Sequence, residues 1–175
     1  MKIPFFDYQS LFRQNEKNLL EIFSNIGQRG AYIMQNDLSD FEKKIEKYTG
    51  IKYAIGVANA TDAMQLLLKT SGIGPGDEVI FCSHTFIATA SAIKSTGATL
   101  IPVECGADHL IDPNAIKKAI TSRTKVIMPT QLNGRIADMD EILTIAEEYG
   151  LQIYEDSAQA LGAKYKNQSA GSFGL

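Results

Sequence analysis

Short apolar runs alternate along the chain with stretches that have helical periodicity. Five of these runs are continuously apolar instead of alternating between apolar and polar positions; they cover 53–57, 78–81, 100–103, 125–128 and 152–155. A strand that is buried on both faces has this continuous pattern, which is typical of a parallel sheet covered by helices. The pattern therefore predicts five strands of a mostly parallel sheet.

The stretches between the runs carry signals for the start and the end of helices. Over 139–149 apolar side chains recur at helical spacing, with Asp138 placed to cap the helix and Gly150 placed to end it. Asp112 and Pro113 open another helix, because proline is favoured at the first helical position. Three further helices are expected to start near these residues: Asp37, Asn59 and Phe86.

Strand and helix follow each other about every 22–28 residues from residue 51 onward. Such repeats form right-handed crossovers between parallel strands, so the predicted fold is α/β with helices on both faces of the sheet. The first 50 residues have helical patterns and no strand signal. We therefore expect a helical segment over 1–50 and an α/β domain over 51–175.

The composition is that of a soluble globular protein, with 45% hydrophobic and 21% charged residues. The net charge is −3 and no basic run favours nucleic acid or an anionic membrane. No apolar stretch is long enough to span a membrane, and the start lacks a signal-peptide core. Cys82 and Cys105, without clustered histidines, form neither a disulfide scaffold nor a zinc pattern. We expect a cytoplasmic protein without a metal site that binds neither nucleic acid nor membrane.

Polar residues follow several predicted strands at their carboxyl ends, where open α/β sheets bind ligands. Thr61 and Asp62 stand at a helix start, which offers free N–H groups to an anion, although a plain capping role is the more common one. Phe86 follows the run 78–81, where an aromatic ring can stack on a flat ligand; burial in the core is the favoured alternative. His84 is more simply a hydrogen-bonded structural residue than a catalyst or ligand.

Charged side chains follow or end the two remaining predicted strands, 125–128 and 152–155. Arg135 can bind a phosphate or carboxylate, but an ordinary surface position is favoured. Glu155 and Asp156 stand at the carboxyl end of the last predicted strand, where a buried carboxylate is costly without a cation. Because neighbours along a strand point to opposite faces, one of the two should face the site and the other a structural partner.

Taken in order, five segments resemble the DegT/StrS-type sugar aminotransferases, a fold-type-I family that depends on pyridoxal phosphate. The segments are AIGVANATDA (54–63), GIGPGDEV (72–79), TFIATA (85–90), NGR with DMD (133–140) and EDSAQA (155–160). The resemblance implies the large cofactor-binding domain of such an enzyme, incomplete here, with the smaller C-terminal domain absent. It also implies transfer of an amino group, usually from glutamate, to a nucleotide-linked keto sugar.

The resemblance assigns roles to five residues. Thr61 and Asp62, with neighbouring backbone amides, would hold the cofactor phosphate. Phe86 would stack on the pyridine ring. Asp156 would pair with the ring nitrogen and keep it protonated, so that the ring acts as an electron sink. Gln159 would donate a hydrogen bond to the phenolic oxygen of the ring.

The lysine that bonds to the cofactor in this family follows the segment 171–174, so it is expected beyond Leu175. Lys164 and Lys166 do not match that position and are expected to be exposed in a loop or hairpin. The resemblance thus implies no catalytic residue and no transaminase activity in these 175 residues alone, and a homodimer for the complete enzyme. Two other interpretations stay open: a sugar dehydratase of the same family that uses the same cofactor, and a non-catalytic truncated remnant.

Overall fold

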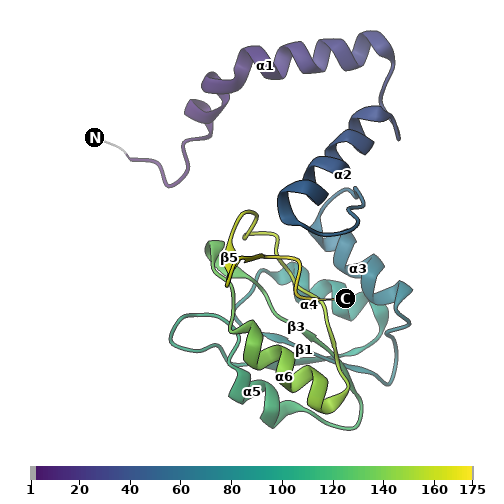
Figure 1. Ribbon diagram of the computed structural model, residues 1–175, viewed down its shortest axis with the longest axis vertical. Coiled ribbons are helices and arrows are strands. Elements are labelled where there is room, and N and C mark those ends of the chain that lie inside the picture. Colours follow the sequence, from purple (N-terminus) through teal and green to yellow (C-terminus); the bar gives the residue numbers. More distant parts are fainter. Residues whose placement is uncertain (1–2, 175) are drawn as a thin grey trace. The chain divides into compact units, whose positions relative to one another are not determined.

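The computed structural model describes residues 3–174 and divides the chain into two units (Figure 1). The first unit ends at Lys43 and the second begins at Lys44, within helix α2 (Asn36–Thr49). The domain start expected at residue 51 stays a prediction. No helix within residues 3–174 is long and apolar enough to cross a membrane.

The first unit is helical, as the sequence predicts. The carboxylate of Asp7 caps helix α1 (Tyr8–Arg29) by accepting a hydrogen bond from the Ser10 amide at 2.9 Å. Arg29 at the end of α1 forms an ion pair with Asp37 at 2.9 Å, and hydrogen bonding to this guanidinium lowers the pKa of the Asp37 carboxyl. Asp37 lies in the first turn of α2, so the helix start expected near this residue is confirmed. Large apolar side chains of α1 are exposed: Leu11, Phe12, Leu19, Leu20, Ile22 and Phe23.

The second unit contains a parallel four-stranded sheet in the order β2–β1–β3–β4. Its strands are β1 (Glu78–Cys82), β2 (Thr99–Val103), β3 (Thr124–Met128) and β4 (Gln152–Ile153). Its helices are α3 (Ala60–Thr70), α4 (Ile87–Thr96), α5 (Pro113–Ala119) and α6 (Met139–Tyr149). The α/β fold and four of the five predicted strands are thereby confirmed.

Helices cover both faces of this sheet (Figure 1). Val79 and Phe81 of β1 pack with α3 and α4, whereas Ile80 and Cys82 pack in the cluster that contains α5 and α6. Successive side chains of a strand point to opposite faces, so a strand covered on both sides needs apolar residues at every position. This is the physical reason for the continuous apolar runs in the sequence.

The predicted strand over 53–57 is absent from the fold. Tyr53 and Ile55 are exposed, and no strand of the described sheet forms a ladder with this segment. An apolar run becomes a strand only where a neighbour accepts and donates its backbone hydrogen bonds. The run 152–155 is also shorter as a strand than predicted, because β4 holds two residues and only an isolated bridge between Thr130 and Asp156 continues the pairing.

Local sequence signals place most helix ends correctly. Asp138 accepts a hydrogen bond from the Glu141 amide at 3.3 Å, and Gly150 ends α6 in the left-handed conformation, with φ of 65°. Asp112 caps α5 by accepting a hydrogen bond from the Asn114 amide at 2.9 Å, just before Pro113. These caps bring the connecting loops back to the sheet edge.

A short hairpin of strands β5 (Lys164–Tyr165) and β6 (Gln168–Ser169) follows the sheet. Lys166 and Asn167 form its turn, with φ values of 47° and 70°. Lys164 and Lys166 are both exposed, as expected from the sequence. The predicted cofactor-bonding lysine would follow Leu175 and lies outside the described residues.

A buried carboxylate closes the amino end of β1. Glu78 is 1% exposed and accepts hydrogen bonds from the Thr121 hydroxyl at 2.5 Å and from Arg123 Nε at 2.9 Å. The Thr121 hydrogen bond, aided by Arg123, lowers the pKa of Glu78 although burial alone would raise it. The charge that the chain buries here is therefore fully partnered within the fold.

Candidate functional site

A pocket of about 220 Å³ lies where the carboxyl ends of the strands meet the start of α3. Four of the five residues that the resemblance singles out line it: Thr61, Phe86, Asp156 and Gln159. The fold brings them together because β-strand ends and helix starts converge at this edge of a parallel sheet. Their roles toward a ligand stay predictions.

Asp156 lines this pocket and is 5% exposed. Its Oδ2 accepts a hydrogen bond from the Thr89 hydroxyl at 2.7 Å, and its Oδ1 accepts one from the Ala158 amide at 3.3 Å. Among residues 3–174, no lysine, arginine or histidine forms an ion pair with it. A buried carboxylate without a cationic partner is costly, so this site favours a positively charged ligand group.

A chain of threonine hydroxyls leads to Asp156. Thr85 Oγ1 lies 2.8 Å from Thr89 Oγ1 and 2.9 Å from Thr130 Oγ1. Because a carboxylate only accepts, Thr89 donates its single proton to Asp156 and accepts from Thr85, which in turn accepts from Thr130. All donors therefore point toward Asp156, which stabilises its negative charge.

Phe86 is 67% exposed and lines the pocket, so the core position favoured from the sequence is wrong. It occupies the cap position of α4, with backbone angles of −69° and 145° and no capping hydrogen bond from its side chain. Phe86 comes four residues after the end of β1 at Cys82, beyond the strand whose alternate side chains pack on the two faces of the sheet. Its ring is available to stack on a flat ligand.

Three polar residues at the start of α3 have different contacts. Asn59 caps the helix by accepting a hydrogen bond from the Asp62 amide at 2.9 Å, and its own amide donates to the Asp62 carboxylate at 3.0 Å. Thr61 lines the pocket, whereas Asp62 is not among the lining residues. The capping role that sequence reasoning considered thus falls to Asn59, and Thr61 is the hydroxyl that this helix start presents to a ligand.

Gln159 is held by the loop that contains the short 3₁₀ helix η1 (Leu132–Gly134). Its Oε1 accepts a hydrogen bond from the Asn133 amide at 3.1 Å, and its backbone carbonyl accepts one from Gly134 at 2.9 Å. Because the side-chain oxygen is engaged, its amide NH₂ is the group suited to a ligand oxygen. Arg135, which follows η1, is exposed as expected.

Glu155 has the structural role that the sequence leaves to one of the two neighbouring carboxylates. It accepts hydrogen bonds from the backbone amides of Phe173 at 2.7 Å and Gly171 at 3.1 Å, and from Gln131 Nε2 at 2.8 Å. Asp156 faces the pocket instead. The expected division between one site residue and one structural partner is confirmed.

Sequence reasoning missed the contributions of Thr89, Thr130 and Met64, all of which are buried beside or within the pocket lining. The available signal for Thr89 is its position four residues after Thr85, one helical turn away. No sequence signal indicates that its hydroxyl meets Asp156, which is 67 residues further along the chain.

A parallel sheet with helices on both faces, and a pocket at the strand ends built on a buried aspartate, define an α/β ligand-binding domain of the kind found in cofactor-dependent enzymes. Sequence comparison makes this assignment specific. The chain belongs to the DegT/DnrJ/EryC1/StrS aminotransferase family, whose profile matches residues 13–175.

Individual relatives agree with the family. A dTDP-3-amino-3,6-dideoxy-alpha-D-galactopyranose transaminase from Aneurinibacillus thermoaerophilus is 43% identical over 98% of this chain and 48% of its own length. The crystal structure of Streptomyces venezuelae DesV in complex with a ketimine intermediate has a TM-score of 0.94 and 40% identity, over 97% of this chain and 46% of that one. NtdA from Bacillus subtilis, with its cofactor PMP bound, has a TM-score of 0.91 and 33% identity, over 97% of this chain and 39% of that one. The chain spans about half the length of the curated relatives it matches.

Proposed function

We propose that this chain is the N-terminal, cofactor-binding part of a pyridoxal-phosphate-dependent aminotransferase that acts on a nucleotide-linked keto sugar, with an amino acid such as glutamate as the donor. Family membership and the substrates named for the sugar transaminase relatives support the class of reaction. The single observation that carries the proposal is the buried Asp156 carboxylate, which faces the pocket without a cation from residues 3–174.

The chemistry of the pocket residues fits pyridoxal phosphate group by group. A protonated pyridine nitrogen supplies the positive charge that Asp156 lacks. The exposed ring of Phe86 offers a stacking surface for the flat heterocycle. Thr61, at the positive end of the α3 dipole, suits the phosphate, and the Gln159 amide suits the phenolic oxygen.

When bound, pyridoxal phosphate supplies an electron sink that eases proton removal next to the transferred amino group. The part of this chain is to hold and tune that group. Asp156, supported by the Thr130–Thr85–Thr89 hydroxyl chain, keeps a proton on the ring nitrogen. Phe86 and Thr61 fix the position of the ring and of the phosphate, and Gln159 orients the ring edge through a donated hydrogen bond.

The proton-moving lysine belongs to the part of the protein expected beyond Leu175. We therefore propose that residues 1–175 alone do not catalyse transamination. The homodimer and the cytoplasmic location expected from the sequence stay predictions.

Borohydride reduction of the full-length protein from its natural source, followed by peptide mapping, tests this proposal. We expect a pyridoxyl phosphate adduct on a lysine downstream of Leu175 and turnover with glutamate and a nucleotide-linked keto sugar. The cofactor bound without any lysine adduct, together with loss of water from the sugar, would establish the dehydratase instead. A natural chain that ends at Leu175 and takes up no cofactor would favour the third interpretation, a non-catalytic truncated remnant.

A further inference from the structure

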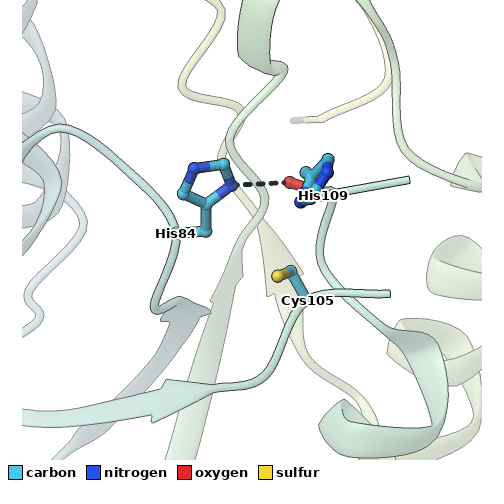
Figure 2. Close-up of side chains that lie close together, drawn as sticks. All are labelled: His84, Cys105 and His109. Carbon is cyan, nitrogen blue, oxygen red and sulfur yellow. Dashed lines mark hydrogen bonds between the residues drawn. The ribbon is translucent and has the colours of Figure 1, made fainter. Parts of the chain in front are cut away.

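Three of the four cysteine and histidine side chains in the sequence meet at one place outside the pocket lining. The chain has two histidines and two cysteines, and both histidines lie beside one of the cysteines. The ligand atoms of His84, Cys105 and His109 all lie within 4.8 Å of one another (Figure 2).

The strand register explains why His84 and Cys105 are neighbours. Cys82 at the end of β1 pairs with Val103 at the end of β2, and the Ser83 amide continues the pairing by donating to the Val103 carbonyl at 2.8 Å. His84 and Cys105 each come two residues after this paired position. Because neighbouring strands lie about 4.8 Å apart, equivalent positions on them lie side by side.

A tight turn adds His109 to this pair. The Gly106 amide donates to the Leu110 carbonyl at 2.8 Å, and a bridge between Cys105 and Ile111 closes the same turn. His109 lies within it in the left-handed conformation, with φ of 66°. A non-glycine residue rarely adopts this conformation, and here it places the imidazole next to Cys105.

The His84 ring already faces the other two residues. Its Nδ1 lies 3.2 Å from the His109 carbonyl oxygen, and Figure 2 shows this edge of the ring turned toward His109. Because a carbonyl only accepts, Nδ1 carries the proton in this arrangement, and a metal ion would replace that proton and move the tautomer to Nε2. Both histidines are exposed and Cys105 is half-buried, so an ion can reach the cluster from solvent.

We propose that His84, Cys105 and His109 bind a divalent cation of the zinc class. Imidazole nitrogen and thiolate sulfur are the ligands that Zn²⁺ prefers, and its bond lengths place ligand atoms of a tetrahedral site about 3.4–3.6 Å apart. The present separations are all within 4.8 Å, and the two imidazoles that would have to move closer are exposed. The Cys105 thiol gives up its proton to solvent on binding, and the three protein ligands leave the fourth position to water.

The surrounding charge also favours a cation. Glu104 and Asp108 flank two of the ligands along the chain, and residues 104–111 include no lysine or arginine. A Zn²⁺ ion with one thiolate ligand keeps a single net positive charge, which these two carboxylates offset. Spacing along the sequence does not reveal this cluster, because two of its three side chains become neighbours only through the sheet.

Metal titration of the full-length protein tests the proposal. Calorimetry with Zn²⁺ should give one equivalent per chain, and Co²⁺ should produce the intense visible bands of a tetrahedral site with a thiolate ligand. Cys105→Ser and His109→Asn should each weaken Zn²⁺ binding more than about tenfold. Asparagine suits position 109 because it tolerates a positive φ.

Cys82→Ala is the matched control, since Cys82 is a buried free cysteine that lies outside the cluster. We expect it to leave the Zn²⁺ affinity and the Co²⁺ spectrum unchanged. Thermal unfolding followed by circular dichroism shows whether each variant is folded, and His84→Gln provides a second ligand variant should one of the others unfold. Wild-type protein without a tetrahedral Co²⁺ spectrum, or folded ligand variants that bind Zn²⁺ as tightly as wild type, would overturn the proposal.

Discussion

Two buried carboxylates lie at opposite ends of the same sheet and differ in what surrounds them. Glu78, at the amino end of β1, accepts hydrogen bonds from two threonine hydroxyls and forms an ion pair with Arg123. Asp156, at the carboxyl edge, accepts hydrogen bonds from Thr89 and one backbone amide, and no cationic side chain of residues 3–174 forms an ion pair with it. The two residues are almost equally buried, at 1% and 5% exposed.

Under the proposed function, this difference distinguishes a structural charge at Glu78 from a ligand-binding charge at Asp156. Burial of an unpaired carboxylate costs several kcal/mol, and the fold meets this cost at Glu78 with its own arginine. At Asp156 the donors from residues 3–174 are neutral, and the carboxylate lines the pocket. In the proposed function a cationic ligand group would complete the second site, whereas the first is complete in the folded chain.

Substitution of Asp156 in the complete enzyme gives the largest expected effect. Asp156→Asn keeps the shape of the side chain but removes the charge that, in the proposed function, holds a proton on the cofactor ring, so kcat/KM should fall by on the order of 10²-fold or more. Steady-state kinetics with cofactor-loaded full-length protein measure this loss. Glu78→Gln is the matched control, because it removes an equally buried charge that has no contact with the pocket.

The two variants should rank the other way round in stability: Glu78→Gln should lower the melting temperature more than Asp156→Asn. Without cofactor, Asp156→Asn should keep or raise the melting temperature, because it removes an unpaired buried charge, and Glu78→Gln should lower it. An Asp156→Asn enzyme with wild-type turnover, or one that is less stable than Glu78→Gln, would contradict the contrast between the two ends of the sheet.

The threonine donor to Asp156 offers a sharper test of the same contrast. Thr89→Val preserves volume and removes the hydroxyl that donates at 2.7 Å, so the carboxylate loses its shortest hydrogen bond. A hydrogen bond to a charged group contributes about 1.5–3 kcal/mol, and we expect the free energy of unfolding in urea to fall by this amount. Thr89→Ser keeps the hydroxyl and should retain most of the stability. Equal losses in the two variants would instead assign the effect to packing.

The parts of this fold that the sequence predicts well depend on local signals. Helices α5 and α6 begin and end where Asp112, Asp138 and Gly150 indicate, because capping requires only residues within one turn. The run 53–57 is as continuously apolar as the runs that do form strands, yet it forms no ladder in the described sheet. A strand needs a hydrogen-bonding partner, which local sequence does not reveal.

The same limit applies to the sites. Thr61, Phe86, Asp156 and Gln159 line one pocket, as the order of family motifs implies. The contacts that distinguish their roles join residues far apart in sequence. Thr89 donates to Asp156 across 67 residues and Arg123 reaches Glu78 across 45, so neither contact follows from spacing or composition. His84 and Cys105 likewise become neighbours only through the register of β1 and β2.

The smallest expected effect is on the pH dependence of the free energy of unfolding below pH 7, to which the Glu78 carboxylate contributes. Its pKa is lower in the folded chain than in the unfolded chain, chiefly because Thr121 donates to the carboxylate, with Arg123 adding to the shift. A lowered folded-state pKa contributes stability that is fully present above the unfolded value of about 4.3 and is lost as the pH falls through the folded-state value. We therefore expect urea unfolding between pH 7 and acid to show a steeper loss of stability in wild type than in Glu78→Gln. Arg123→Gln removes the ion pair but keeps Thr121. Its loss of stability with falling pH should be intermediate between those of wild type and Glu78→Gln, since the threonine hydrogen bond makes the larger contribution to the lowered pKa.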